Sequence, residues 1–244
     1  EESKSFGANL LWRNPYIEEI RELSRSGNLD FNKKVIGTFQ LLKQKFSWNG
    51  EYKLYSENLD KVLKTGTGSN ADLNFIFIGM LKSFGIKAYP VVMSRRSAGM
   101  LPVSFPSLQK LNTFVVAIYD EVKGKYVYLD GSMDIPALNV LPVELSVTKA
   151  RILSADIPEN KKWVNLQEIP TNQIFMKISA NAQGSQITGR RTTILKGHDA
   201  LGYRKEYQTK DSLVNKQELV KEKLAISNLK RTEMEDDFAT IQED

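Results

Sequence analysis

The stretch that decides the fold is GSNADLNFIFIGMLKSFGIKAYPV, residues 68–91. Apolar side chains lie almost all the way round the segment from Leu73 to Phe84, a pattern typical of a helix buried on every side. Gly85 follows in the position where a left-handed residue commonly ends a helix. The next residues, IKAYPVVM, predict a strand, although Pro90 argues against a fully hydrogen-bonded central position for it. We therefore expect a buried central helix that leads into a sheet.

Helices precede this stretch and a hairpin follows it. Asp30 is a helix-start signal, and an apolar stripe follows it at helical spacing: Phe31, Val35, Phe39, Leu42 and Phe46. TFVVAIY and YVYLD, joined around Lys123 and Gly124, predict an antiparallel hairpin, with shorter strands at 151–153 and 163–164. The sequence thus predicts an α+β fold, in which N-terminal helices and the central helix pack on a small antiparallel sheet.

The pattern divides the chain into a core, residues 1–170, and a C-terminal extension, residues 171–244. In the extension, QIFMKISA and SQITGRRTTIL predict two strands, and the pattern becomes helical from about Asp199 to Leu224. The chain begins without Met and ends in an acidic tail. We therefore expect a longer parent protein, in which the extension is the start of a following domain or a truncated region.

Composition excludes several kinds of chemistry. The chain has no cysteine and one histidine, His198, so disulfides, thiolate metal sites and a cysteine nucleophile are excluded. We expect neither a metal nor a cofactor. The net charge is +5, but the Lys and Arg residues are scattered and do not alternate with aromatic residues, so we do not expect nucleic-acid binding. No apolar run is long enough to cross a bilayer.

Three polar residues stand at informative positions in the predicted elements. Asn70 lies at the beginning of the central helix, Asn112 at the beginning of the first hairpin strand, and Asp130 at the end of the second. A cysteine at such a helix N-terminus would have a lowered thiol pKa. A histidine on the adjacent strand could pair with it, and an aspartate on the next could orient that histidine. The three positions have the layout of a Cys-His-Asp triad.

The residues around these positions resemble the transglutaminase-like core of the papain-like superfamily. Its signature is Gly-x-Cys at the start of a helix that ends in a Gly-Ile-x-Ala turn; here Gly68-Ser69-Asn70 and Gly85-Ile86-Lys87-Ala88 stand in those places. Asn112 and Asp130 fall where the family has its His and Asp. FSWNGEY, PVVMSRR, YLDGS and WVNL extend the resemblance to multi-domain bacterial proteins, in which a β-rich domain of unknown function precedes this core and another β-rich domain follows it.

The departures from the family pattern decide the predicted function. Asn replaces both the Cys and the His, and an amide is neither a nucleophile nor a general base near neutral pH. We therefore expect a non-catalytic module, a pseudoenzyme, that binds a peptide or glycan or acts in domain assembly beside the flanking β-rich domains. The resemblance also implies an extracytoplasmic location, in the periplasm or at the cell surface.

The candidate ligand-binding residues are Trp48, Ser69, Asn70, Arg95, Asn112 and Asp130. All of these residues except Ser69 also have a purely structural interpretation. Asn70 could be the N-cap of the helix, Asn112 the end of a loop, and Asp130 part of a turn. Trp48 could belong to the core or a pocket wall, and Arg95 to a solvated loop.

Two other functions fit the sequence. Asp72, Asp130 and Asp134 could converge as the carboxylates of a hydrolase acting on a glycan, for which two carboxylates must lie roughly 5 to 10 Å apart. The chain could instead be a structural spacer between β-rich domains. In that case the loop at 94–111 would fill the cleft with Met100, Leu101 and Phe105.

Overall fold

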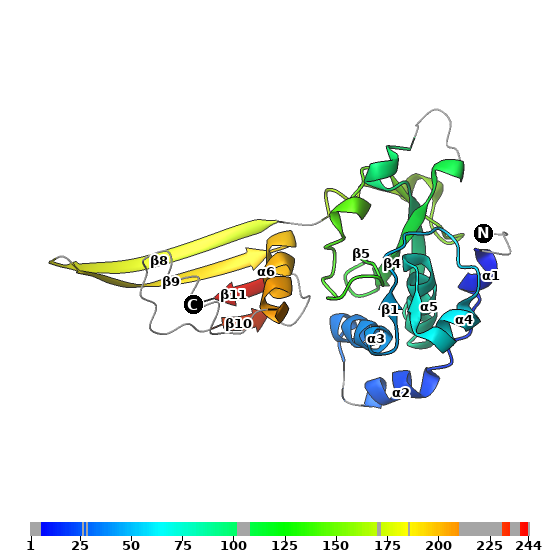
Figure 1. The fold of residues 1–244 in the computed structure, drawn as a ribbon, viewed down its shortest axis with the longest axis horizontal. Coiled ribbons are helices and arrows are strands. Elements are labelled where there is room, and N and C mark those ends of the chain that lie inside the picture. Colours follow the sequence, from blue (N-terminus) through cyan, green and yellow to red (C-terminus); the bar gives the residue numbers. More distant parts are fainter. Residues whose placement is uncertain are drawn as a thin grey trace. The chain divides into compact units, whose positions relative to one another are not determined.

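The computed structural model describes residues 6–25, 27, 29–101, 108–169, 172–184, 186–209, 231–234 and 240–243. It divides into two compact units, Glu1–Ile169 and Pro170–Asp244. The first unit contains helices followed by an antiparallel sheet, and the second contains four strands and a helix (Figure 1). The predicted α+β class, with N-terminal helices, a buried central helix and C-terminal strands and helix, is confirmed.

Five helices form one side of the first unit. Their bounds are α1 Gly7–Leu10, α2 Ile17–Arg25, α3 Phe31–Lys45, α4 Leu59–Thr65 and α5 Asn70–Ser83. Asp30 caps α3 as predicted, since its side chain accepts a hydrogen bond from Lys33 N. Two short parallel strands, β1 (Ser47–Trp48) and β2 (Thr67–Gly68), pair directly before α5 and fix the path of the chain into that helix.

The central helix α5 is buried on every side, as its apolar pattern predicts. All residues from Asn70 to Leu81 are buried. The ring of Phe77 meets that of Phe39 on α3 edge to face at 5.7 Å, and the ring of Phe75 lies 4.8 Å from that of Phe114 on the sheet. Burying each such ring contributes about 1.5 to 3 kcal/mol to the free energy of unfolding. The helix ends at Gly85, which has the expected positive φ of 77°.

The sheet of the first unit has five strands in the order β5-β4-β3-β6-β7, all antiparallel. Their bounds are β3 Ala88–Met93, β4 Thr113–Asp120, β5 Lys125–Leu129, β6 Ala150–Ile152 and β7 Trp163–Val164. Helix α5 packs on β3 and β4. The other face of the sheet is covered by the chain from about 133 to 169, where Leu141, Leu145 and Leu166 pack against Val91 and Val115. This covering chain includes short 3-10 helices at Val143–Leu145 and Glu159–Lys161.

Strand β3 lies between β4 and β6 at the centre of the sheet, but its register with β6 does not include Pro90, so Pro90 is not fully hydrogen-bonded, as the sequence predicts. The carbonyl of Pro90 accepts a hydrogen bond from Leu153 N at 2.8 Å, so the polar groups of Pro90 face the β6 side. On that side the pairing of β3 with β6 covers Val91 to Met93. The pairing of β3 with β6 therefore ends at Pro90, which accepts one hydrogen bond from Leu153 N and has no N–H to donate the second one in return.

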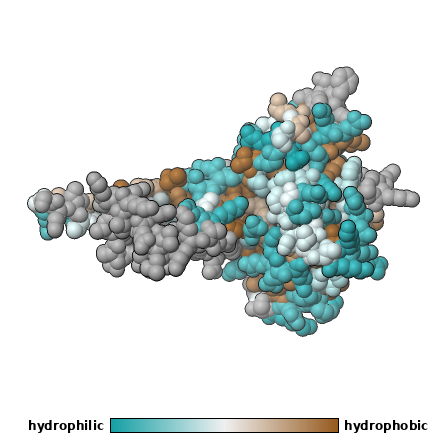
Figure 2. All heavy atoms as spheres, viewed as in Figure 1, coloured by the Kyte–Doolittle hydropathy of each residue, from teal (hydrophilic) through white to brown (hydrophobic). Residues whose placement is uncertain are grey.

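The second unit has a four-stranded antiparallel sheet in the order β10-β11-β9-β8. Its elements are β8 Gln173–Gln183, β9 Gln186–Lys196, α6 His198–Thr209, β10 Arg231–Met234 and β11 Thr240–Glu243. The two predicted strands form the long β8–β9 hairpin. The predicted helix begins at His198; residues 210–224 of that prediction lie outside the described residues. Apolar side chains are exposed along β8, namely Ile174, Phe175, Met176 and Ile178 (Figure 2).

Within the described ranges, no helix is long and apolar enough to cross a membrane. This agrees with the expectation from the sequence.

Two helical glycines give a matched test of how tightly α5 is packed. A Cβ added at Gly79 would lie 2.6 Å from Trp12 Cε3, whereas one at Gly37 on α3 would meet nothing closer than 3.8 Å. We expect Gly79→Ala to lower the free energy of unfolding by about 1 to 3 kcal/mol through overpacking. We expect Gly37→Ala to raise it by about 0.5 to 1 kcal/mol, since alanine favours the helix. Urea unfolding of both variants measures the two effects, and a stable Gly79→Ala variant would contradict the packing.

Candidate functional site

The N-cap of α5 is Ser69, not Asn70, which corrects one structural interpretation of Asn70. The Ser69 hydroxyl and the Asp72 carboxylate form a capping box, in which Asp72 Oδ2 accepts hydrogen bonds from Ser69 N at 2.8 Å and Ser69 Oγ at 2.7 Å. A Cβ at Gly68 would lie 2.9 Å from both Asp72 Cβ and Val62 Cγ1, so only glycine fits beside the cap. Ser69 is buried and its hydroxyl is committed to the helix end.

Asn70, at the position of the family cysteine, is completely buried and uses its whole side-chain amide in hydrogen bonds. Its Oδ1 accepts from Lys53 N at 2.7 Å, and its Nδ2 donates to Thr113 Oγ1 at 2.6 Å and to the Phe114 carbonyl at 3.2 Å. Its backbone N–H donates to the Glu51 carbonyl at 3.0 Å. Asn70 therefore ties the segment 51–53 to strand β4.

Asn74, one turn further along α5, repeats this arrangement. Its Nδ2 donates to the Phe114 carbonyl at 2.8 Å and to Asp130 Oδ1 at 2.9 Å, and its Oδ1 accepts from Gly131 N at 2.7 Å. Residues four apart on a helix share one face, so Asn70 and Asn74 meet at the same carbonyl of β4. We call these two side chains the amide pair.

Asp130 is also completely buried, and its carboxylate faces the amide pair through Asn74. Its other described hydrogen bonds come from Ser132, through the backbone N–H at 3.5 Å and the hydroxyl. Burial raises the pKa of the Asp130 carboxyl above its usual value, while the hydrogen bonds from Ser132 and Asn74 and the charge of Lys43 act in the opposite direction. Asp130 thus lies in the predicted turn and holds it against α5.

Asn112, at the position of the family histidine, is not a hydrogen-bond partner of Asn70. Its Oδ1 accepts from Arg95 N at 3.0 Å, and its backbone N–H donates to the Met93 carbonyl. Neighbouring residues of a strand point to opposite faces, and the hydroxyl that reaches Asn70 belongs to the next residue, Thr113. The structure therefore links the Asn70 and Asp130 positions through the Phe114 carbonyl and Asn74, and leaves Asn112 outside this network.

Trp48 and Arg95 come together around Tyr52. The Trp48 ring lies 5.0 Å from the Tyr52 ring, and its Nε1 donates to the Glu51 carbonyl at 3.0 Å. The Arg95 guanidinium lies 5.2 Å from the Tyr52 ring centroid, a cation–π contact. Burial raises the pKa of Tyr52 to about 12, with further contributions from the charges of Asp130 and Glu144. The segment that covers Asn70 is therefore held in place from outside by these two side chains.

The carboxylates of the hydrolase hypothesis have separate surroundings. Asp72 belongs to the capping box, Asp130 is enclosed, and the Asp134 side chain is 80% exposed beside Lys43. None of the three lines the cavities beside Asn112, between Arg96 and Lys149, or beside Arg151. The structure does not bring them to one cavity.

Of the loop residues that the spacer hypothesis places in the cleft, the two that the structure describes do not fill the site. Met100 is 82% exposed and Leu101 is buried elsewhere, beside a separate cavity. Phe105 lies outside the described residues. The segment 51–53 covers Asn70 instead.

A cavity that shares Lys53 with this network is open to solvent and has a volume of about 700 Å³. Its lining residues are Asn9, Lys53, Leu54, Tyr55, Ser56, Glu57, Leu111 and Asn112. One candidate, Asn112, lines it, and Lys53 connects it to Asn70. Ser56 is 3% exposed, and its Oγ has no hydrogen-bond partner among the described residues. The Ser56 hydroxyl oxygen is therefore enclosed beneath the wall of the cavity.

Sequence reasoning missed Tyr52, Asn74, Thr113 and Ser132, which complete the network. Asn74 carried a usable signal, because a second asparagine four residues after Asn70 on a helix of apolar residues must share its face. Tyr52 carried none, because its contact with the Arg95 guanidinium joins residues 43 positions apart.

Among the described residues, no three His, Cys, Asp or Glu side chains gather as a metal site. His198 lies in the second unit, at the beginning of α6, where its backbone N–H donates to Asn172 Oδ1 at 2.8 Å.

No protein-family model matches the chain, and no curated protein matches it. Solved structures similar to it include a candidate protease from Parabacteroides distasonis, with 15% identity over 52% of this chain and a TM-score of 0.38. A candidate cysteine protease from Cytophaga hutchinsonii is similar over 53% of the chain, with 12% identity and a TM-score of 0.35. A structure named as a TGase is similar over 52% of the chain, with 16% identity and a TM-score of 0.33.

The matches span 28%, 43% and 32% of the lengths of these three proteins, less than half in each case. At such TM-scores the likeness carries no argument about the chemistry of this chain.

Removing the Asn70 amide tests its structural role. Asn70→Ala leaves the buried Lys53 N–H and Thr113 hydroxyl without a partner, so we expect the free energy of unfolding to fall by about 3 kcal/mol. The exposed Asn160 offers a matched control, and Asn160→Ala should change it by less than about 0.5 kcal/mol. Urea unfolding measures both. Equal stabilities of the two variants would show that the hydrogen bonds of Asn70 contribute nothing.

The buried Asp130 predicts a pH dependence of stability. Its folded pKa is raised above the unfolded value of about 3.9, so the folded state binds more protons than the unfolded state between the two values. The free energy of unfolding should therefore fall as the pH rises from about 4 through the folded pKa. Asp130→Asn removes this titration. Urea unfolding at a series of pH values should show the wild-type value falling relative to the variant, and a constant or rising difference would contradict the prediction.

Proposed function

We propose that the chain is a non-catalytic, transglutaminase-like module that binds a neutral polar ligand, a glycan or a peptide, in the open cavity beside Asn112. The observation that carries the proposal is the state of Asn70. At the position of the family nucleophile stands an amide that is enclosed and committed to three hydrogen bonds.

The absence of catalysis follows from chemistry as well as access. An amide neither attacks a carbonyl nor accepts a proton near neutral pH. Ser69, the nearest hydroxyl in sequence, is held in the capping box with Asp72. Asp130 retains a carboxylate, but its described partners are Asn74 and Ser132, and it orients no histidine.

Binding is supported by the lining of the open cavity. Its two charged side chains are balanced, because Lys53 Nζ lies 3.6 Å from Glu57 Oε1 and 3.1 Å from Glu51 Oε2. An ionic ligand would therefore find little net charge. A polar group remains for a neutral ligand, since no described residue accepts a hydrogen bond from Asn112 Nδ2.

A glycan fits this lining better than a peptide. Tyr55 is 45% exposed and presents a ring on the cavity wall, beside the amide groups. An aromatic ring with polar neighbours offers an apolar surface for the carbon face of a sugar and partners for its hydroxyl groups. The volume of about 700 Å³ lies within the usual range for small-molecule sites.

The flanking β-rich domains and the extracytoplasmic location belong to the same proposal. Both come from the resemblance to multi-domain bacterial proteins. The exposed apolar strand β8 in the second unit is compatible with a neighbouring domain.

A structural spacer is the second candidate, and one observation favours it. The network around Asn70 and Asp130 serves packing alone, as a spacer requires. The two candidates differ in whether the cavity beside Asn112 takes a ligand.

Binding to neutral oligosaccharides separates the two candidates. We expect wild-type protein to bind members of a set containing cellohexaose, maltohexaose and chitohexaose, measured by isothermal titration calorimetry. Tyr55→Ala should weaken binding at least about tenfold, since the loss of an anchoring aromatic contact costs about 1.4 kcal/mol or more. Trp163 has a similar exposure of 46% outside the cavity, so Trp163→Ala should bind as the wild type does.

Two outcomes would contradict the proposal. If neither these sugars nor uncharged peptides bind, the spacer function stands in its place. If the wild type hydrolyses or cross-links a peptide substrate and Asn70→Ala abolishes that turnover, the protein is an enzyme after all.

A further inference from the structure

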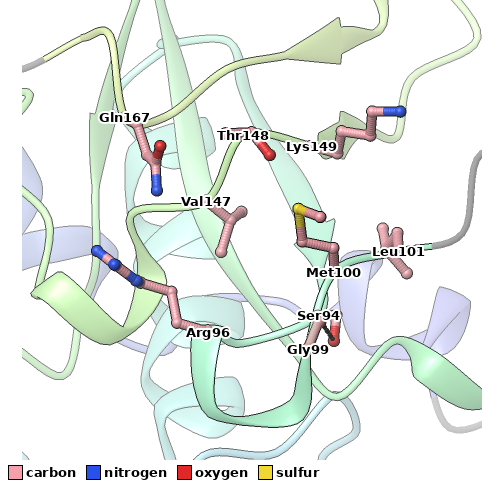
Figure 3. Close-up of a pocket in the computed structure, with 9 residues that line it drawn as sticks. All are labelled: Ser94, Arg96, Gly99, Met100, Leu101, Val147, Thr148, Lys149 and Gln167. Carbon is pink, nitrogen blue, oxygen red and sulfur yellow. Dashed lines mark hydrogen bonds between the residues drawn. The ribbon is translucent and has the colours of Figure 1, made fainter.

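A second cavity, of about 240 Å³, lies in the first unit and shares no lining residue with the cavity beside Asn112. It is formed by the residues that follow β3 and by the chain before β6. Its lining residues are Ser94, Arg96, Gly99, Met100, Leu101, Val147, Thr148, Lys149 and Gln167 (Figure 3). A ligand of this cavity is therefore independent of one bound beside Asn112.

The charged side chains that line this cavity are all basic. Arg96 and Lys149 line it, and its lining contains no acidic residue. The acidic residue whose charge interacts with that of Arg96 is Glu144, which does not line the cavity. Its carboxylate accepts hydrogen bonds from Ser97 N and Ser97 Oγ. No described residue makes an ion pair with Lys149. The cavity is thus suited to an anion.

The hydrogen-bonding groups lie mainly at one end. In Figure 3, Arg96 and Gln167 lie at one end of the cavity and Lys149 at the other, with Val147, Thr148 and Met100 between them. Gln167 Nε2 donates one hydrogen to the Ser146 carbonyl at 3.2 Å and has a second hydrogen to give. A guanidinium binds both oxygens of a carboxylate, which makes the Arg96 end suited to that group.

The rest of the lining is apolar. Val147 and Leu101 are 8% and 7% exposed and present methyl groups to the cavity. Met100 is 82% exposed on the facing loop, and a thioether chain adapts to an irregular apolar ligand. The cavity is smaller than the roughly 300 to 1,000 Å³ of sites for drug-sized ligands. Its occupant is therefore about as large as one amino-acid residue.

We infer that this cavity is a binding site for a small carboxylate that carries a branched apolar group. The carboxylate pairs with Arg96, and the apolar group lies against Val147, Leu101 and Met100. Such a group occurs both at the C-terminus of a peptide that ends in leucine and in a free short branched-chain acid.

Three related probes test this site. N-acetyl-leucine represents the chain terminus, 4-methylpentanoate represents the free acid, and N-acetyl-leucinamide is the uncharged control. We expect N-acetyl-leucine to shift the backbone amide NMR signals of Gly99 and Thr148. The leucinamide should bind at least about tenfold more weakly, because it cannot make the charged hydrogen bonds. Tighter binding of N-acetyl-leucine than of 4-methylpentanoate assigns the site to a chain terminus, and the reverse order assigns it to the free acid.

Variants locate the binding. Arg96 is exposed on a surface turn, so Arg96→Gln should leave the fold intact and weaken N-acetyl-leucine about tenfold. Thr148→Trp fills the cavity from its exposed rim and should abolish the shifts. Arg25→Gln removes an equal charge from exposed α2 and should leave the affinity unchanged.

Four results would overturn the inference: equal binding of the acid and its amide, equal weakening by Arg25→Gln and Arg96→Gln, shifts confined to residues away from the cavity, or no binding of any probe.

Discussion

The side chains of Asn70 and Asn74 hold the beginning of α5 to the sheet, and the arrangement around the site depends on them. Both donate to the carbonyl of Phe114, so one turn of the helix is fixed to one residue of β4. Asn74 also donates a hydrogen bond to Asp130, in the turn after β5, and Asn70 accepts one from Lys53 in the segment 51–53. Because these groups are buried, each unmade hydrogen bond would carry a full desolvation cost.

The same hydrogen bonds leave no room for a reacting group at the beginning of α5. An active thiol needs space for a substrate and a neighbouring base. Asn70 has neither, because the 51–53 segment lies on it and Thr113 occupies the partner position. The carboxylate of Asp130, which would orient a histidine in a triad, accepts hydrogen bonds from Asn74 and Ser132. Asn70 and Asp130 are thus both part of the packing.

Two of the cavities on the first unit, the one beside Asn112 and the one lined by Arg96 and Lys149, differ in chemistry. The one beside Asn112 balances its charges through the contact of Lys53 with Glu57 and presents hydroxyl, amide and aromatic groups. The one between Arg96 and Lys149 has a basic side chain at each end and apolar side chains between them. A neutral polar ligand suits the first and a small apolar anion suits the second, because desolvating a charge is favourable only where an opposite charge compensates it.

The sequence by itself determined the elements and excluded the thiol chemistry. The spacing of apolar residues and the turn residues predicted α5, the β4–β5 hairpin and the β8–β9 hairpin, because both signals act over a few neighbouring residues. Tertiary structure alone decided which polar groups meet. It placed Thr113 rather than Asn112 against Asn70, covered Asn70 with Lys53, and allowed Pro90 in a central strand beside the end of β6. Those outcomes depend on strand facing and on contacts between residues 17 to 56 positions apart, which no local pattern records.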